Sequence, residues 1–258
     1  MRRTVVLSVP LASMVTGCAP AGPSAPHSSS PAPSASGIGV TPSGPPIPSS
    51  APATGQPVTF AASDGTMLTG RVFGSGQTTV ILSNMGDNDS TGWEAFAPRL
   101  AAAGVRVLVY AYRYPPGGFR PPHATAVVHD LRGAAASARS DGTQRIILMG
   151  ASLGGILTAK LAGTLGAAAV VVLSSPRDLA EYGLVVSDAE LAAIAGPKLF
   201  VAAADDPIVP AAETEAVFRA VAEPRAWKLY PEGGHGVLIL RSAHGEDLSR
   251  RLVSFVEA

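Results

Sequence analysis

Short apolar runs recur along the chain from residue 58 onward, and longer amphipathic segments separate them. Each run is continuous and rich in β-branched residues, as is usual for strands that are buried on both faces. Alternation of such strands with helical segments is typical of a mostly parallel sheet that helices flank. The pattern therefore predicts an α/β fold with eight strands, at residues 57–62, 67–73, 79–83, 105–111, 145–149, 168–173, 198–203 and 226–230.

The segments between the strands refine this topology. The first two strands are joined by S-D-G at residues 63–65, a short polar turn that suits an antiparallel hairpin. The remaining strands are separated by segments with apolar residues at helical spacing, which favours parallel pairing. The expected helices cover residues 124–139, 153–165, 210–221 and 245–256, with a short one at 188–195.

The composition limits the classes of protein that this chain can belong to. Its 258 residues, 47% of them apolar, suffice for one sizeable core but not for two large domains. Lys plus Arg and Asp plus Glu both total 19, so no net charge draws the protein to nucleic acid, and we expect no such partner. Cys18 is the single cysteine of this sequence, which excludes an internal disulfide and a cysteine-rich metal site.

The first residues have the layout of a secretory signal. Arg2 and Arg3 precede an apolar run at 5–15, which is too short to span a membrane as a stable helix. The run ends in V-T-G-C at residues 15–18, which resembles a bacterial lipobox. That resemblance implies removal of a signal peptide at 1–17, lipid attachment to Cys18, export, and anchoring at the extracytoplasmic face of the cell membrane. An ordinary secretory signal, in which Cys18 is incidental, is the alternative.

Residues 18–56 are dominated by Pro, Ser, Ala and Gly. Such a segment cannot bury enough apolar surface to offset its ordering entropy, so we expect a disordered tether that acts as a passive spacer. The folded domain is then expected at residues 57–258.

A glycine-rich turn follows the expected strand at 145–149. It reads G-A-S-L-G-G at residues 150–155, and a helical pattern begins directly after Ser152. This order fits G-x-S-x-G, a tight strand-to-helix turn in which flanking glycines avoid clashes and the serine hydroxyl stands at a helix N-terminus. Ser152 is therefore the candidate nucleophile. A glycine-rich turn with an N-cap serine would carry the same residues.

With this motif in its context, residues 58–258 resemble the α/β-hydrolase family. The resemblance is greatest to carboxylesterase-like or lipase-like members without a lid and to dienelactone-hydrolase-like members, which typically have a cysteine where this chain has Ser152. It implies hydrolysis of an ester, thioester or amide through an acyl-enzyme, without a metal or an organic cofactor. Many relatives insert a helical cap where this chain has the short segment 174–197, so we expect a minimal cap or none, and an open site.

A serine hydroxyl needs a base to accept its proton and a carboxylate to orient that base. The strand at 198–203 is followed by A-D-D-P-I-V-P at 204–210, which resembles the family's acid loop and places Asp206 as the acid, with Asp205 as its rival. His235 lies in a loop after the last strand, where the family places its general base. The other histidines lie in the tether, on helices or at helix edges.

The family also implies two backbone donors for the oxyanion. One is the N–H of Leu153, directly after the nucleophile, and the other comes from the loop after the strand at 79–83. Relatives usually begin that loop with His-Gly or His-Gln, and this chain has Asn84-Met85 instead. Because a backbone donor does not depend on the side chain, Met85 remains the candidate. Trp93 lines the pocket or packs in the core.

Together these features predict a carboxylic ester hydrolase whose triad is Ser152, Asp206 and His235, acting on a small-molecule ester. A serine peptidase or an acyltransferase with the same triad is an alternative. A non-catalytic binding lipoprotein is another, and the Asn84-Met85 departure is its best support. The fold does not choose among substrates, and the sequence does not indicate the oligomeric state.

Overall fold

The computed structural model of the protein describes residues 55–258. The expected signal peptide at 1–17, the lipidation residue Cys18 and nearly all of the tether at 18–56 lie outside the described residues. The first strand begins at Gln56, one residue before the expected start of the domain.

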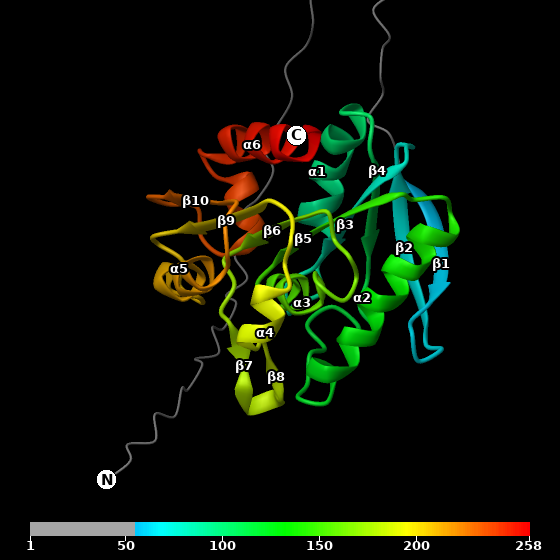
Figure 1. The fold of residues 1–258 in the computed structure, drawn as a ribbon, viewed down its shortest axis with the longest axis horizontal. Helices are drawn as coiled ribbons and strands as arrows, with labels where there is room; N and C mark the ends of the chain where they lie inside the picture. Colours follow the sequence, from blue (N-terminus) through cyan, green and yellow to red (C-terminus); the bar gives the residue numbers. More distant parts are fainter. Residues whose placement is uncertain (1–54) are drawn as a thin grey trace, which may run out of the picture. The chain divides into compact units, whose positions relative to one another are not determined.

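Eight strands form one sheet in the order β1-β2-β4-β3-β5-β6-β9-β10, as Figure 1 shows. β1 and β2 form the antiparallel hairpin expected from the S-D-G turn, and β2 is also antiparallel to β4. The other neighbours are parallel, so the predicted mostly parallel sheet is confirmed. The strands are β1 (Gln56–Ala61), β2 (Met67–Phe73), β3 (Thr78–Ser83), β4 (Arg106–Tyr110), β5 (Arg145–Ala151), β6 (Ala169–Leu173), β9 (Lys198–Ala203) and β10 (Arg225–Tyr230).

Both faces of the sheet are buried, which explains the continuous apolar runs. In β5, Leu148 belongs to one hydrophobic core, while its neighbours Ile147 and Met149 belong to the core on the opposite face. All three side chains are fully buried. Successive side chains of a strand point to opposite faces, so a strand covered on both sides must be apolar at every position.

Helices cover the two faces unequally. Residues of α1 and α6 pack in one core, and residues of α2, α3, α4 and α5 pack in the other, in agreement with their places above and below the sheet in Figure 1. The helices are α1 (Thr91–Ala102), α2 (His123–Ser140), α3 (Leu153–Leu161), α4 (Asp188–Ala192), α5 (Ala211–Ala220) and α6 (Gly245–Glu257). Among the helices of residues 55–258, none is long and apolar enough to cross a membrane.

The structure contains α1, a helix that is not among the predicted ranges, and it differs from the predicted elements at other places as well. α3 ends at Leu161, four residues before the expected end, and the chain continues in turns to Gly166. α4 is one short helix of 188–192 rather than 188–195. Before it lies a small hairpin, β7 (Asp178–Leu179) and β8 (Leu184–Val185), joined by a 3-10 turn, η1 (Ala180–Tyr182), in the segment where a minimal cap was expected.

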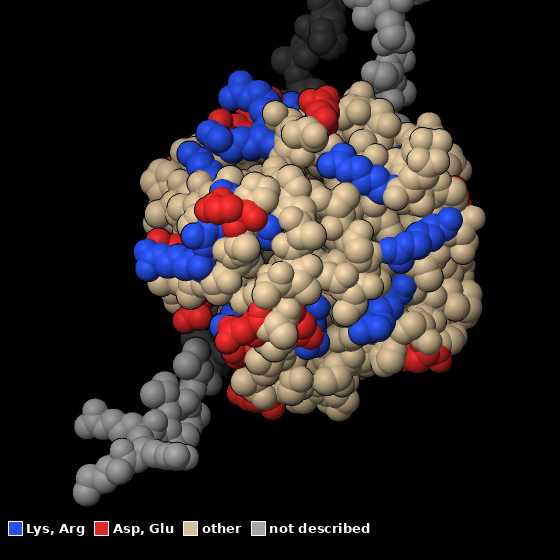
Figure 2. Space-filling model, in the orientation of Figure 1, with Lys and Arg blue, Asp and Glu red and all other residues tan. Residues whose placement is uncertain are grey.

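The charged side chains give no dominant field on the face shown in Figure 2. Lys and Arg lie in several separate groups there, Asp and Glu lie between or beside them, and uncharged surface separates these groups.

The residues that follow the parallel strands β3, β5, β6, β9 and β10 all leave the sheet at its carboxyl edge, because parallel strands end on the same side. The candidate site residues lie in these loops.

Candidate active site

Ser152 occupies a strained turn between β5 and α3. Its φ of 52° and ψ of −117° are unfavourable for a residue other than glycine, and its N–H donates to Leu173 O at 2.9 Å. Glycine is required on both sides by close approach. A Cβ at Gly154 would lie 2.3 Å from Ser83 O, and a Cβ at Gly150 would lie 2.1 Å from the Gly154 carbonyl oxygen. The G-x-S-x-G spacing thus lets the serine turn pack against the end of β3.

Two buried hydroxyls brace this turn from the other side. Ser175 Oγ donates to the backbone oxygen of Ser152 at 2.9 Å. The N–H of Ser175 in turn donates to Thr214 Oγ1 at 2.8 Å, and that hydroxyl donates back to Ser175 O at 3.1 Å. Thr214 belongs to α5, so the turn is tied to the helix that follows the acid loop. No sequence pattern indicates this link, because Ser175 and Thr214 belong to no motif and lie far from Ser152 along the chain.

The structure brings His235 and Asp206 together. His235 Nδ1 lies 2.8 Å from Asp206 Oδ2 and 3.1 Å from Oδ1, and the two residues are 4% and 9% exposed. Asp206 Oδ1 also accepts the N–H groups of Ile208 and Val209, both at 2.9 Å, which fixes the carboxylate in its loop. A carboxylate at Nδ1 makes that nitrogen the protonated one, which leaves Nε2 as the ring's acceptor.

Asp205, the rival for the acid position, has a different partner. Its Oδ1 accepts the backbone N–H of Gly234 at 2.9 Å, and hydrogen bonds from the backbone of Gly234 and Gly233 lower the pKa of its carboxyl group. Asp205 therefore holds the loop that carries His235, whereas Asp206 contacts the imidazole itself.

Ser152 and His235 line the same cavity, of about 290 Å³. Within the described part of the chain, no hydrogen bond joins Ser152 Oγ to the imidazole. Hydrogen bonds between a nucleophile and its base are often long in the absence of substrate and tighten when a substrate binds. The shared cavity leaves room for a reacting group beside both side chains.

The two candidate oxyanion donors have no hydrogen-bond acceptor among residues 55–258. Neither the N–H of Met85 nor that of Leu153 donates to another group of the described chain. The loop of His235 packs against Met85, since a Cβ at Gly236 would lie 2.6 Å from Met85 Sδ. Ser152 lines one cavity with Met85 and another with Leu153, so both residues border cavities that the serine also lines.

Asn84, which replaces the histidine usual in relatives, has a structural role. Its Nδ2 donates to Tyr110 O at 3.0 Å and to Asn88 Oδ1 at 3.1 Å. Asn88 has a positive φ of 57°, and its side chain also bonds the backbone of Tyr112 and Tyr114. The two buried asparagines thus fasten the loop that carries Met85 to the chain that leaves β4. The side chain of Asn84 therefore acts through the loop's backbone and through Asn88.

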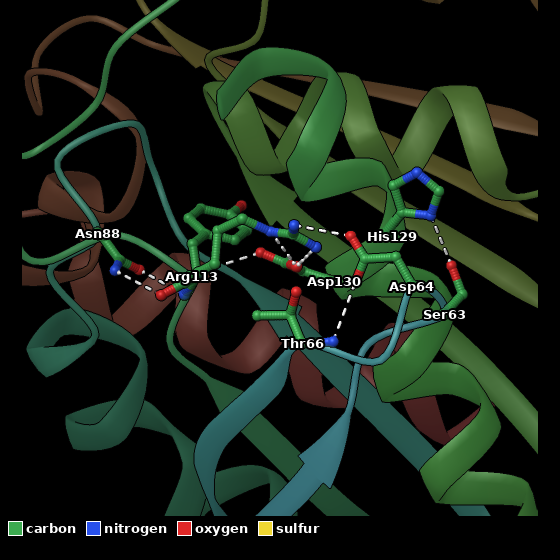
Figure 3. Close-up of polar contacts among 8 residues, drawn as sticks. Ser63, Asp64, Thr66, Asn88, Arg113, His129 and Asp130 are labelled. Atoms are coloured by element: carbon green, nitrogen blue, oxygen red, sulfur yellow. Dashed lines mark hydrogen bonds and ion pairs between the residues drawn. The ribbon is translucent and has the colours of Figure 1, made fainter. Parts of the chain in front are cut away.

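An ion pair anchors the same chain to α2. Arg113 donates from Nε and Nη2 to Asp130 Oδ1 at 2.9 and 2.6 Å, and from Nη1 to Asp64 Oδ2 at 2.8 Å, as Figure 3 shows. The Asp130 side chain is fully buried, and this burial raises the pKa of its carboxyl group. The guanidinium of Arg113 lowers the pKa of Asp64. This network fixes the segment after β4, on which the asparagine pair depends.

Other candidate residues lie away from this chemistry. His129 lies on α2 and accepts or donates a hydrogen bond with Ser63 Oγ at 2.8 Å (Figure 3). His123 begins α2 and His244 precedes α6, as the sequence predicted. Trp93 lies on α1 and is fully buried, and its Nε1 donates to Ser83 O at 3.1 Å, so of its two predicted positions the structure supports the core.

A second cavity, of about 490 Å³, also has Ser152 in its lining. Its lining is mostly apolar and comes from the serine turn, the acid loop, the hairpin β7–β8 and the loop before α2. No cluster of three or more His, Cys, Asp or Glu suited to a metal ion occurs in residues 55–258. The lining residues are Gly86, Phe119, Ser152, Leu153, Ile156, Pro176, Asp178, Leu179, Tyr182, Ile208, Val209, Pro210 and Glu213.

The comparisons with solved structures identify the fold. The esterase domain of a Rhodothermus marinus protein superposes with a TM-score of 0.64 at 19% identity, covering 78% of this chain and 97% of that one. The Pyrococcus furiosus esterase Pf2001 gives a TM-score of 0.67 at 15% identity, covering 80% and 92%. The protein thus has the α/β-hydrolase fold, as the sequence predicted.

A closer relative is known by sequence. The uncharacterized protein Rv2307c of Mycobacterium tuberculosis (strain ATCC 25618 / H37Rv) is 31% identical over 220 residues, which cover 75% of this chain and 78% of the relative. The chain belongs to the same family as this mycobacterial protein. No protein-family model matches the sequence.

Proposed function

We propose that the protein is a serine hydrolase that cleaves carboxylic esters through an acyl-enzyme intermediate. The observation that carries the proposal is the buried pair of His235 and Asp206, which shares a cavity with Ser152 on its strained turn. The names of the two solved relatives, both called esterases, give further support to ester cleavage rather than binding alone.

In this reaction His235 Nε2 accepts the proton of Ser152 Oγ, and the oxygen attacks the carbonyl carbon of the ester. The carbonyl oxygen becomes an oxyanion that accepts the N–H groups of Leu153 and Met85. The intermediate then collapses, the bond to the alcohol oxygen breaks, and His235 gives its proton to that oxygen. A water molecule repeats the sequence on the acyl-enzyme and releases the acid.

Asp206 does not exchange a proton with the substrate. Its carboxylate keeps Nδ1 of His235 protonated and the ring oriented, and it stabilises the imidazolium that forms during each half of the reaction. The two backbone amides that fix Asp206 hold this orientation before a substrate binds. The arrangement therefore lowers the barrier by preorganisation rather than by movement of the acid loop.

The test is turnover of short-chain nitrophenyl esters by the full chain, compared with Ser152→Ala. We expect the variant to lose at least about 10³-fold in kcat, and His235→Ala to lose nearly as much, because triad members act as a unit. A serine peptidase or acyltransferase would instead prefer peptides or a second acceptor. A binding protein would show no turnover in any of these assays, and that result would refute the proposal.

We further propose that the protein is exported and anchored by lipid on Cys18 at the extracytoplasmic face of the cell membrane. The proposal rests on the lipobox-like sequence at residues 15–18. Mass spectrometry of the protein from its membrane fraction tests it. A diacylglyceryl mass on an N-terminal Cys18 is the expected result, and an unmodified N-terminus or cleavage at another position would contradict it.

A further inference from the structure

Ser152 lies between two cavities of different chemistry. The larger, of about 490 Å³, and the smaller, of about 290 Å³, share three residues, Gly86, Ser152 and Ile208. A substrate bonded to the serine can therefore extend into both cavities at once, with one part of the molecule on each side of the reacting carbon. Which part enters which cavity depends on the residues that the cavities do not share.

His235 lines the smaller cavity and not the larger one. In ester cleavage, the imidazole must hand its proton to the alcohol oxygen as that oxygen leaves. The alcohol therefore departs on the side of His235, through the smaller cavity. The acyl group stays bonded to Ser152 until water attacks, so it occupies the larger cavity.

The larger cavity has an aromatic wall that two separate segments build. Phe119 comes from the loop between β4 and α2, and Tyr182 comes from η1 in the hairpin β7–β8. Their rings meet edge to face, with centroids 5.8 Å apart and planes at 68°. Phe119 also packs edge to face on Tyr114, which donates to the oxygen of Gly86, so the wall is connected to the loop of Met85.

The charges at the larger cavity are all negative. Asp178 and Glu213 are its only charged lining residues, and neither Lys nor Arg lines it. The smaller cavity has charges of both signs, with Asp87, Asp89 and Arg241 in its lining. Burial of a hydrocarbon chain against the apolar lining of the larger cavity is favourable. A carboxylate at the end of an acyl group would be repelled there by Asp178 and Glu213.

We propose that the larger cavity binds the acyl group of an uncharged, apolar carboxylic acid, and that Phe119 and Tyr182 determine how long or bulky this group can be. The smaller cavity then takes the alcohol. The inference rests on the proposed function and specifies its substrate class. Half-esters of dicarboxylic acids, in which the acyl group ends in a free carboxylate, are poor substrates because Asp178 and Glu213 repel that charge.

The first test measures kcat/KM of the full chain for nitrophenyl esters from acetate to dodecanoate. In Phe119→Ala and Tyr182→Ala, the ratio of decanoate to butyrate turnover is expected to rise by about fivefold or more, since added space in an apolar pocket admits further methylene groups. Leu238→Ala is the matched control, because Leu238 lines only the smaller cavity. It should leave this ratio within about twofold and change the preference among alcohols of different size instead.

The second test needs no destabilised variant. The wild-type protein should cleave the neutral butyrate ester at least about tenfold faster than the ester of succinate that carries a free carboxylate. Glu213 is exposed, and Glu213→Gln keeps the shape of the side chain while removing one of the two negative charges of the larger cavity. The substitution should therefore narrow the difference in kcat/KM between the butyrate and succinate esters.

The inference and the proposed function fail in different ways. The proposed function holds if the wild type cleaves esters and Ser152 reacts with a fluorophosphonate. In that case, the assignment of the larger cavity is overturned if Phe119→Ala and Tyr182→Ala both keep the wild-type ratio of decanoate to butyrate turnover. It is also overturned if the succinate ester is cleaved as well as the butyrate ester. If the wild type neither cleaves esters nor reacts with the fluorophosphonate, the proposed function itself falls, and the inference falls with it.

Discussion

Replacing Asn88 by glycine removes the side chain that holds the loop carrying Met85. Asn88 is 4% exposed and has a φ of 57°, a conformation that glycine adopts without strain. Its Oδ1 accepts from Asn84 Nδ2 at 3.1 Å and from Tyr112 N at 2.9 Å, and its Nδ2 donates to Tyr114 O at 2.6 Å. Three buried hydrogen bonds at about 1 kcal/mol each predict a loss of about 3 kcal/mol in the free energy of unfolding.

The assay is urea unfolding, in which the midpoint should fall while the slope stays constant. Ester turnover should fall as well, mainly in kcat, because the loop positions the Met85 amide. Loss of one oxyanion donor, about 10²- to 10³-fold, is the upper limit. As a control, Asn88→Ala should be less stable than Asn88→Gly by about 1 kcal/mol, since alanine is strained at positive φ. Wild-type stability together with wild-type kcat in Asn88→Gly would refute this account of the loop.

Three further predictions follow from other contacts. Asp206→Asn should lower kcat about 10³- to 10⁴-fold, because it favours the wrong tautomer of His235. Asp205→Asn should lower kcat by less than about tenfold, and equal losses in steady-state assays would contradict the pairing of Asp206 with His235. Arg113→Met should lower the free energy of unfolding by about 3–5 kcal/mol in urea, because it leaves Asp130 as an unpaired buried charge. The double variant Arg113→Met with Asp130→Leu should regain part of this free energy, and a double variant no more stable than Arg113→Met would contradict the charge penalty. Ser175→Ala should lower kcat by about tenfold or more with little change in KM, because the serine turn loses its brace; an effect confined to KM would count against this role.

The sequence predicted the sheet well because burial on both faces leaves a distinct pattern. Strands such as β5 and β9 must be apolar at every position, and a run of this kind is visible without any knowledge of its neighbours. Five of the six helices that cover the sheet were predicted from their apolar residues at helical spacing, whereas α1 was not among the predicted ranges. Among the predicted helices, the errors lie at the ends, as in α3, where the chain leaves the helix through turns whose hydrogen bonds still resemble helical ones.

The small hairpin β7–β8 could not be predicted. Each of its strands has two residues, which is too short for any periodicity to be read, and its position depends on contacts between Tyr182 and Phe119 from distant segments. The aromatic wall of the larger cavity was missed for the same reason. Trp93 shows the converse case, since its sequence position allowed both a pocket and a core location, and packing decides between them.

For the candidate site, the sequence identified residue types and their order, but not their partners. Asp205 and Asp206 are adjacent and chemically identical, and a resemblance alone favoured the second. The structure separates them through hydrogen bonds to Gly234 and His235. Likewise, Asn84 was visible only as a departure from the family pattern. Its role depends on Asn88 and on backbone oxygens of the segment after β4, which come together only in the folded chain.

The reactivity of the hydroxyl of Ser152 tests the central claim most directly. The full chain would be incubated with a fluorophosphonate and digested, and the modified peptide would be sequenced by mass spectrometry. The account predicts one adduct, on Ser152, that forms much more slowly in His235→Ala and is absent in Ser152→Ala. Labelling at another residue, or ester cleavage that persists in Ser152→Ala, would contradict it.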